Sequence, residues 1–280
     1  MLKIHFAMTE FSRRTFTGTG LVIVIMSATW CGPYSFMTLL LLIDLLSLME
    51  FYRLLEIPGA KTSKIGAALL SMVLMLSGFG AITHLTSWKW TLMVIPVAFS
   101  IFVAALYRHT KKPFQGLAIT FLGVIIITLP LCCFAAIPFL ARPHGSYHFA
   151  LPAGCFLLLW ANDTAAYLSG RWLGRHPLFL RISPKKTWEG SVGGLAAALT
   201  VACVLAQFFT LLSPTELAIL SVTIVITGTF GDLVKSLLKR SLDIKDSGTI
   251  LPGHGGMLDR FDSLLGSAPF IFAYLILLAW

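Results

Sequence analysis

Nine apolar runs, each about 16 to 26 residues long, divide the chain and constrain what it can fold into. A transmembrane helix needs roughly 20 predominantly apolar residues, and only helices or closed barrels satisfy their backbone hydrogen bonds in hydrocarbon. The runs are unbroken rather than alternating, which argues against a barrel. We therefore predict an all-α polytopic membrane protein with about nine transmembrane helices. The expected spans are 16–31, 34–53, 65–83, 90–107, 115–140, 149–169, 191–212, 217–234 and 264–280.

The positions of the basic residues predict how these helices are oriented. If the N-terminus is cytoplasmic, 19 of the 21 Lys and Arg residues fall on the cytoplasmic side, and only Lys89 and Arg142 do not. This bias follows the positive-inside rule, so the net charge of +9 is explained by topology and gives no reason to expect a nucleic-acid partner. The count requires the first run to be a retained helix, not a cleaved signal peptide. We expect one integral domain, with five helices in 1–148 and a catalytic region in 149–280.

The most polar segment is SLLKRSLDIKDSGTILPGHGGMLDRFD, residues 236–262, called here the signature loop. Only 12% of the whole chain is charged, yet this loop holds eight fixed charges. They are Lys239, Arg240, Asp243, Lys245, Asp246, Asp259, Arg260 and Asp262. Carboxylates are ligands that Mg²⁺ prefers, cations bind phosphate, and the glycine-rich turn at 252–256 can cradle an anion. The combination suits Mg²⁺-assisted phosphoryl or nucleotidyl transfer; the alternative is a solvated loop whose charges only mark topology.

A second polar segment, SPKKTWEG, covers residues 183–190. Ser183 is predicted to cap a helix whose first residue is Pro184. A helix N-terminus beside Lys185 and Lys186 would form an anion site. The alternative is a basic anchor on anionic lipid.

Two aspartates lie inside predicted spans, where ionisable groups are costly and usually functional. Asp163 lies in Asn162-Asp163-Thr164, and Asp232 in Gly231-Asp232-Leu233 near the cytoplasmic end of the eighth span. Two carboxylates that face one cavity resemble a two-metal clamp; the alternative is helix packing. Asp44, within the second span and without a motif around it, is interpreted as a packing or oligomer contact.

Taken together, these segments resemble the phosphatidate cytidylyltransferases, also called CDP-diacylglycerol synthases. The resemblance rests on the signature loop and on the three shorter motifs, in the same order over about residues 162–262. It implies transfer from CTP to phosphatidic acid, which gives CDP-diacylglycerol and pyrophosphate, with Mg²⁺ required and a second metal ion, divalent or monovalent, compatible with the site. It also implies an enzyme of the bacterial cytoplasmic (inner) membrane, in contact with membrane lipids, whose active site faces the cytoplasm. A homodimer is compatible with the family.

The resemblance assigns roles to residues by number. Implied metal ligands are Asp163, Asp232, Asp246, Asp259 and Asp262. Implied catalytic residues are Asp232, Lys239, Arg240, Lys245, Asp246 and Arg260. Implied nucleotide-binding residues are Ser183, Lys185, Lys186, Thr187, His254, Gly255 and Gly256.

The chain departs from the family pattern at Lys235, where bacterial relatives usually carry Glu. The reversed charge leaves open a slower enzyme, a changed lipid preference, or a catalytically altered paralogue that acts as a scaffold. A membrane transporter is the alternative from another class, but transporters usually place polar groups near the midplane of repeated halves.

Overall fold

The computed structural model describes residues 17–140, 146–244, 248 and 255–279. It divides into two compact units. Unit 1 comprises Met1–Thr128 and Ile244–Phe261, and unit 2 comprises Leu129–Asp243 and Asp262–Trp280. The division into 1–148 and 149–280 within one integral domain stays a prediction.

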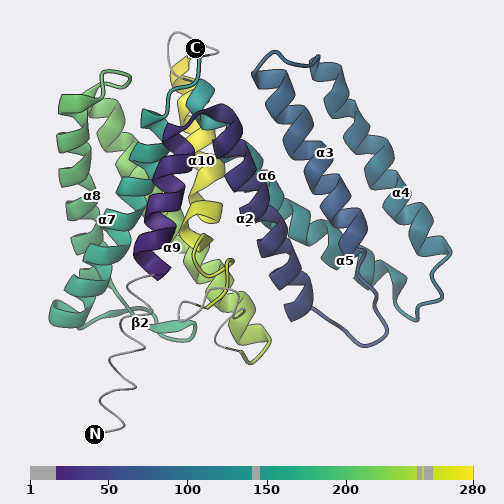
Figure 1. The fold of residues 1–280 in the computed structure, drawn as a ribbon. Coiled ribbons are helices and arrows are strands. Elements are labelled where there is room, and N and C mark those ends of the chain that lie inside the picture. The colour runs from purple at the N-terminus through teal and green to yellow at the C-terminus, as the bar shows by residue number, and fades with distance from the viewer. Residues whose placement is uncertain (1–16, 141–145, 245–247, 249–254, 280) are drawn as a thin grey trace, which may run out of the picture. The chain divides into compact units, whose positions relative to one another are not determined.

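Unit 1 is built from helices, and Figure 1 shows α3 beside α4. Its elements are the helix Thr17–Trp30, α2 (Pro33–Leu54), α3 (Lys64–Ile82), the 3-10 helix η1 (Trp88–Met93), α4 (Val94–Leu106), α5 (Pro113–Gly123) and the π-helical turn η2 (Val124–Thr128). Large apolar side chains point outward from these helices, among them Leu106 and Phe114, which are 80% and 77% exposed. Such a surface suits contact with lipid better than contact with water.

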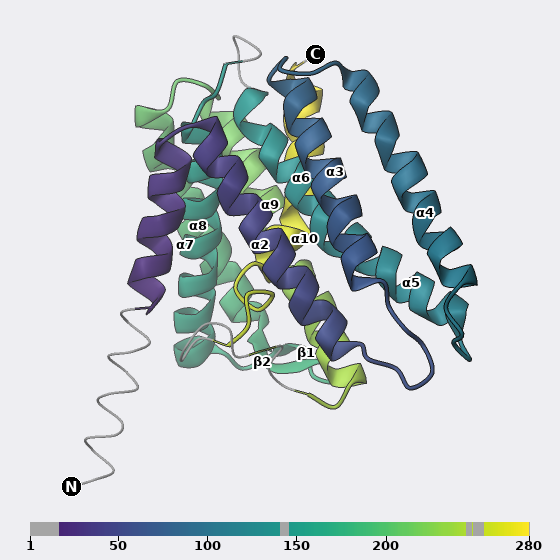
Figure 2. The ribbon, with the colours of Figure 1, turned by 45° about the vertical axis from the view of Figure 1, so that its right-hand side comes forward.

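Unit 2 is also mainly helical, with α7 and α8 side by side in both views (Figures 1 and 2). Its elements are α6 (Leu129–Ala136), the 3-10 helix η3 (Ile137–Phe139), α7 (Ala150–Leu173), β1 (Pro177–Phe179), β2 (Ser183–Thr187), α8 (Trp188–Phe208), α9 (Pro214–Ser241) and α10 (Asp262–Ala279). A capping box starts α9: the Ser213 hydroxyl accepts from the Glu216 amide, and the Glu216 carboxylate accepts from the Ser213 amide.

The predicted helical character is confirmed, since every predicted span contains helix in the described residues. Among the residues that the structure describes, six helical runs are long and apolar enough to cross a membrane. They are Pro33–Leu54, Lys64–Ile82, Trp88–Leu106, Pro113–Phe139, Trp188–Phe208 and Pro214–Ser241. The helices Thr17–Trp30 and Asp262–Leu278 are apolar but shorter. Nine spans and a cytoplasmic N-terminus therefore stay predictions.

The predicted helix start at Ser183 is wrong. Residues 183–187 form strand β2, which pairs antiparallel with β1, so the chain is not purely α-helical. Helix α8 begins at Trp188 and is capped by Thr187, whose hydroxyl accepts from the Gly190 amide at 3.1 Å. Thr187 is itself a good N-cap residue. The sequence therefore contains two possible N-cap residues, Ser183 and Thr187, four positions apart.

Asp44 is a packing residue, as one of its two interpretations expected. Its carboxylate is fully buried in unit 1 and accepts hydrogen bonds from the hydroxyl groups of Ser71 and Thr128. These bonds connect α2 with α3 and η2. A buried carboxylate without such donors would be costly, so the aspartate fixes how the three elements pack.

Candidate active site

Five charged side chains of unit 2 come together from four elements. Asp163 comes from α7, Lys186 from β2, Asp232 and Lys235 from α9, and Asp262 from the first turn of α10. We call this group the carboxylate–lysine cluster.

Helix α9 supplies the centre of the cluster because of its residue spacing. Asp232, Lys235, Ser236 and Lys239 are three to four residues apart and therefore share one face of the helix. The Ser236 hydroxyl donates to Asp232 Oδ1 at 3.4 Å, and Lys239 lies within electrostatic range of Asp232. The helix continues to Ser241, so the beginning of the signature loop is helical.

A contact between two glycines brings α9 and α10 together at this point. A Cβ atom built on Gly231 would lie 2.6 Å from Gly266 Cα, and one built on Gly266 would collide with Gly231 Cα. The two backbones therefore touch, which only glycine permits here. Asp232 follows Gly231, and Asp262 lies one helical turn before Gly266. Their carboxyl groups are consequently within hydrogen-bonding reach of each other.

Two ion pairs connect the cluster, and they differ in burial. Lys186 Nζ lies 2.6 Å from Asp232 Oδ2, with side chains 29% and 27% exposed. Lys235 Nζ lies 3.6 Å from Asp262 Oδ2, with side chains only 8% and 16% exposed. We call these the outer and the inner pair.

Asp163 joins the cluster from α7. The Ser263 hydroxyl donates to its Oδ2 at 3.4 Å, and the Asn162 side-chain amide donates to its Oδ1 at 3.1 Å. Lys186 and Asp232 are both within electrostatic range of this carboxylate. Asp163, Asp232 and Asp262 therefore belong to one charged group.

Three carboxylates and two ammonium groups form a site that can hold cations and phosphate oxygens together. Within the described ranges, no group of three or more His, Cys, Asp or Glu side chains is arranged to hold a metal ion. Mg²⁺ in phosphate-transfer sites, however, is usually bound by one or two carboxylates together with substrate phosphates. The neighbouring carboxylates of Asp232 and Asp262 fit that requirement.

The other predicted site residues lie in different settings. Lys185 and Arg240 are exposed, Thr187 caps α8, and Ser183 pairs with Phe179 in the hairpin. Four of them belong to unit 1: Gly255, Gly256, Asp259 and Arg260. Three lie outside the described residues: Lys245, Asp246 and His254.

Three residues of structural interest were not among the predicted site residues. Lys235 was noted in the sequence only as a departure from the family pattern, and its position three residues after Asp232 places it on the same helix face. Ser263 adjoins Asp262 and contacts Asp163. Glu50 contacts the signature loop in unit 1, and its charge at the end of a span was its only signal in the sequence.

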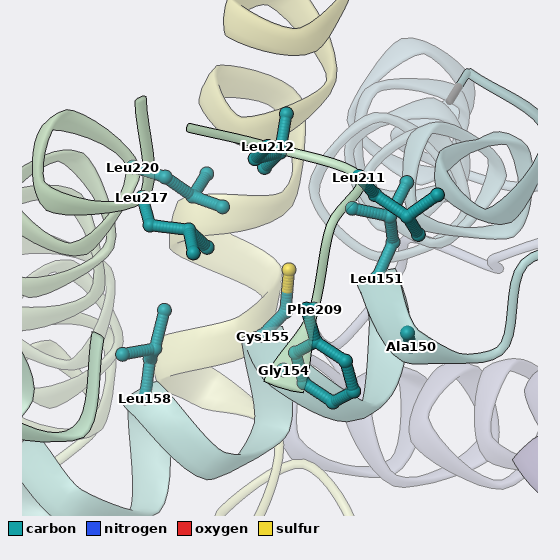
Figure 3. A pocket seen from close by; sticks show the side chains of 10 residues that line it. All are labelled: Ala150, Leu151, Gly154, Cys155, Leu158, Phe209, Leu211, Leu212, Leu217 and Leu220. Carbon is teal, nitrogen blue, oxygen red and sulfur yellow. The ribbon is translucent and has the colours of Figure 1, made fainter. Parts of the chain in front are cut away.

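An apolar pocket in unit 2 is not part of the cluster. It lies between the first turns of α7 and α9 and is lined by Leu151, Cys155, Phe209 and Leu217 among other apolar residues (Figure 3). Its volume of about 10 Å³ is at the lower limit for one water molecule. It is therefore a small packing gap, without room for a substrate.

The family model and the similar proteins point to the same family. A model described as "Cytidylyltransferase family" matches residues 12–278. Proteins named phosphatidate cytidylyltransferase are similar: that of Staphylococcus haemolyticus is 33% identical over 261 residues, which cover 91% of this chain and 94% of the relative. That of Bacillus subtilis is 33% identical over 276 residues, covering 96% and 99%. That of Haemophilus influenzae is 44% identical over 137 residues, covering 47% of each chain.

Proposed function

Because the chain belongs to the cytidylyltransferase family, we propose that it is a phosphatidate cytidylyltransferase. It would transfer CMP from CTP to phosphatidic acid and release pyrophosphate. The observation that carries the proposal is the carboxylate–lysine cluster, since Asp163, Lys186, Asp232 and Asp262 come from the four sequence segments that resemble that family. Its fifth member, Lys235, is the position at which the chain departs from the family pattern. The names of the relatives give no support to a transporter.

The reaction joins two anions, so charge neutralisation is the main task of the site. A phosphate oxygen of phosphatidic acid attacks the α-phosphorus of CTP, a new P–O bond forms, and the bond to the β-phosphate breaks. A phosphate monoester is already nucleophilic at neutral pH, so a dedicated general base is not required. Lys186 and Lys239 would neutralise phosphate oxygens in the proposed site. Lys185, Arg240, Lys245 and Arg260 remain candidates for the same role.

Mg²⁺ is the proposed cofactor. Asp232 and Asp262 would be its ligands, with Asp163, Asp246 and Asp259 as further candidates; a second ion, divalent or monovalent, is compatible with so many carboxylates. When bound, the ion would supply positive charge to the triphosphate and the leaving pyrophosphate. Lys186, which pairs with Asp232, would then be available to bind phosphate.

We further propose that the chain has nine spans and a cytoplasmic N-terminus in a bacterial inner membrane. The charge asymmetry of the sequence supports this topology, and it would place the cluster on the side where CTP is found. A homodimer is part of the proposal only by analogy with the family.

The test is an assay of the purified protein in mixed micelles with labelled CTP, phosphatidic acid and Mg²⁺. We expect a lipid-soluble cytidine product, and much less of it from Asp232→Asn. The matched control is Asp44→Asn, because that aspartate is buried in unit 1 and serves packing. The proposal fails if no phosphatidic acid species yields the product with the wild-type protein.

A further inference from the structure

Glu50 is a buried glutamate near the end of α2, with 2% of its surface exposed. Burying a carboxylate is costly unless hydrogen bonds compensate for the lost water. The groups in unit 1 that donate hydrogen bonds to Glu50 therefore indicate what the buried carboxylate does.

Both carboxylate oxygens of Glu50 accept hydrogen bonds from consecutive backbone amides of the signature loop. The Met257 amide donates to Oε1 at 2.9 Å, and the Leu258 amide donates to Oε2 at 2.8 Å. Hydrogen bonds to an ionised group are among the strongest in proteins. Glu50 thus binds a backbone segment more than 200 residues away in sequence.

The other arm of the same loop also approaches Glu50. A Cβ atom built on Gly248 would lie 2.6 Å from Glu50 Oε1 and 3.0 Å from its Cδ. A Cβ built on Gly255 would lie 3.9 Å from the Gly248 carbonyl oxygen, so the two arms come close to each other. Glu50 therefore contacts the signature loop at two places, at Gly248 and at Met257–Leu258.

Asp44, a second buried acid of the same helix, provides a contrast. Its hydrogen-bond donors are side-chain hydroxyl groups on neighbouring packed elements, Ser71 and Thr128. Glu50 accepts from main-chain amides of a loop. Packing of α2 against its neighbouring helices accounts for the hydrogen bonds to Asp44. It does not account for the hydrogen bonds between Glu50 and the loop.

We propose that Glu50 is a positioning residue for nucleotide binding: it holds the Met257 and Leu258 amides so that the adjoining Gly255 and Gly256 present their backbone to CTP. The inference rests on the proposed function for the identity of the nucleotide. The contact between Glu50 and the loop stands on geometry alone. Gly255, in the left-handed region at φ +84°, and Gly256 lie next to the held amides, so loosening this contact would change the surface offered to phosphates.

The first experiment measures amide hydrogen exchange of the full-length protein in detergent. Glu50→Gln replaces one acceptor oxygen by an NH₂ donor that faces a backbone N–H, so one of the two hydrogen bonds is lost. We expect exchange in residues 255–261 to accelerate by about 10-fold or more, the factor for one charge-assisted hydrogen bond. Asp44→Asn is the matched control and should leave exchange in this segment unchanged.

The second experiment separates positioning from folding by kinetics. In Glu50→Gln, the KM for CTP should rise by about 10-fold, while the KM for phosphatidic acid stays within about 2-fold of the wild-type value. Gly248→Ala should show the same pattern, because its added Cβ pushes against the intact Glu50 carboxylate. This variant also keeps the test open if Glu50→Gln does not fold.

The outcomes are distinct. Loop-specific exchange together with a raised KM for CTP supports the proposal. Unchanged exchange in residues 255–261 of Glu50→Gln overturns it. Faster exchange throughout α2 in both Glu50→Gln and Asp44→Asn also overturns it. So does faster exchange confined to residues 255–261 if the KM for CTP is unchanged. If the wild-type protein makes no lipid-linked cytidine, the proposed function fails, and an unchanged exchange profile in Glu50→Gln would still refute the contact independently.

Discussion

Replacing Lys235 by methionine tests whether the inner pair is an essential part of the cluster. Methionine is similar in length but uncharged, so the change removes the ammonium group from Asp262 with little change in packing. The inner pair is the longer of the two, at 3.6 Å, but also the more buried, with side chains 8% and 16% exposed.

The expected cost follows from burial more than from distance. At an effective dielectric constant of about 20, unit charges 3.6 Å apart attract by roughly 5 kcal/mol. Part of that attraction offsets the cost of removing both groups from water, but taking away one partner leaves a buried charge uncompensated, which typically costs about 3 kcal/mol or more. We therefore expect Lys235→Met to lower the free energy of unfolding by about 3 kcal/mol.

The assay is unfolding of the purified protein by SDS in mixed micelles without divalent cations. Lys64→Met is the control, because Lys64 pairs with Glu56 at only 2.5 Å but with side chains 47% and 65% exposed. Exposed pairs contribute little, so the shorter pair should matter less. The double variant Lys235→Met/Asp262→Asn should recover most of the loss, since asparagine carries no charge to leave unpaired. An equal cost for Lys64→Met and Lys235→Met, or no recovery in the double variant, would refute the reasoning.

Three further predictions concern the same region. Lys235→Glu adds another carboxylate to the cluster, so it should make the protein less stable without divalent cations and should increase the rise in melting temperature caused by Mg²⁺. Equal Mg²⁺-induced shifts in the melting temperatures of variant and wild type would count against a cation site here. Gly266→Ala should lower the melting temperature and the activity, because its Cβ collides with Gly231, whereas Gly78→Ala in α3 meets no atom within 4 Å and should be neutral or slightly stabilising. Asp246→Asn should abolish lipid-linked cytidine formation and leave the melting temperature unchanged; full activity would remove Asp246 from the proposed metal ligands.

Helices were predictable from the sequence because long apolar runs allow few other structures. The β1–β2 hairpin was not predictable, because the pairing of residues 177–179 with 183–187 depends on contacts that no periodic pattern in the sequence indicates. At Ser183 the local capping rule failed because it cannot rank two good caps four residues apart. Local signals therefore indicated that a helix begins in this segment, but not at which residue.

Motifs identified four of the five cluster residues, Asp163, Lys186, Asp232 and Asp262, without indicating which of them touch. The pairing of Lys186 with Asp232 joins residues 46 positions apart, and the contact of Asp163 with Ser263 joins residues 100 apart. Both depend on how helices pack, and the glycine contact between α9 and α10 decides part of that packing. Such contacts need the tertiary structure, which is also why Glu50 passed unnoticed in the sequence.

The difference in burial between the two ion pairs suggests that Lys186 and Lys235 have different roles. The outer pair, Lys186 with Asp232, is more than a quarter exposed, so solvent or substrate can replace either partner at small cost. The inner pair, Lys235 with Asp262, cannot separate without leaving a buried charge. Lys186 is therefore the better candidate for a lysine that moves from carboxylate to phosphate when CTP binds, whereas Lys235 would stay in place and hold the Asp262 carboxylate. The charge reversal at Lys235 is on this reasoning compatible with catalysis, because it adds a fixed cation to a site that has to gather phosphates.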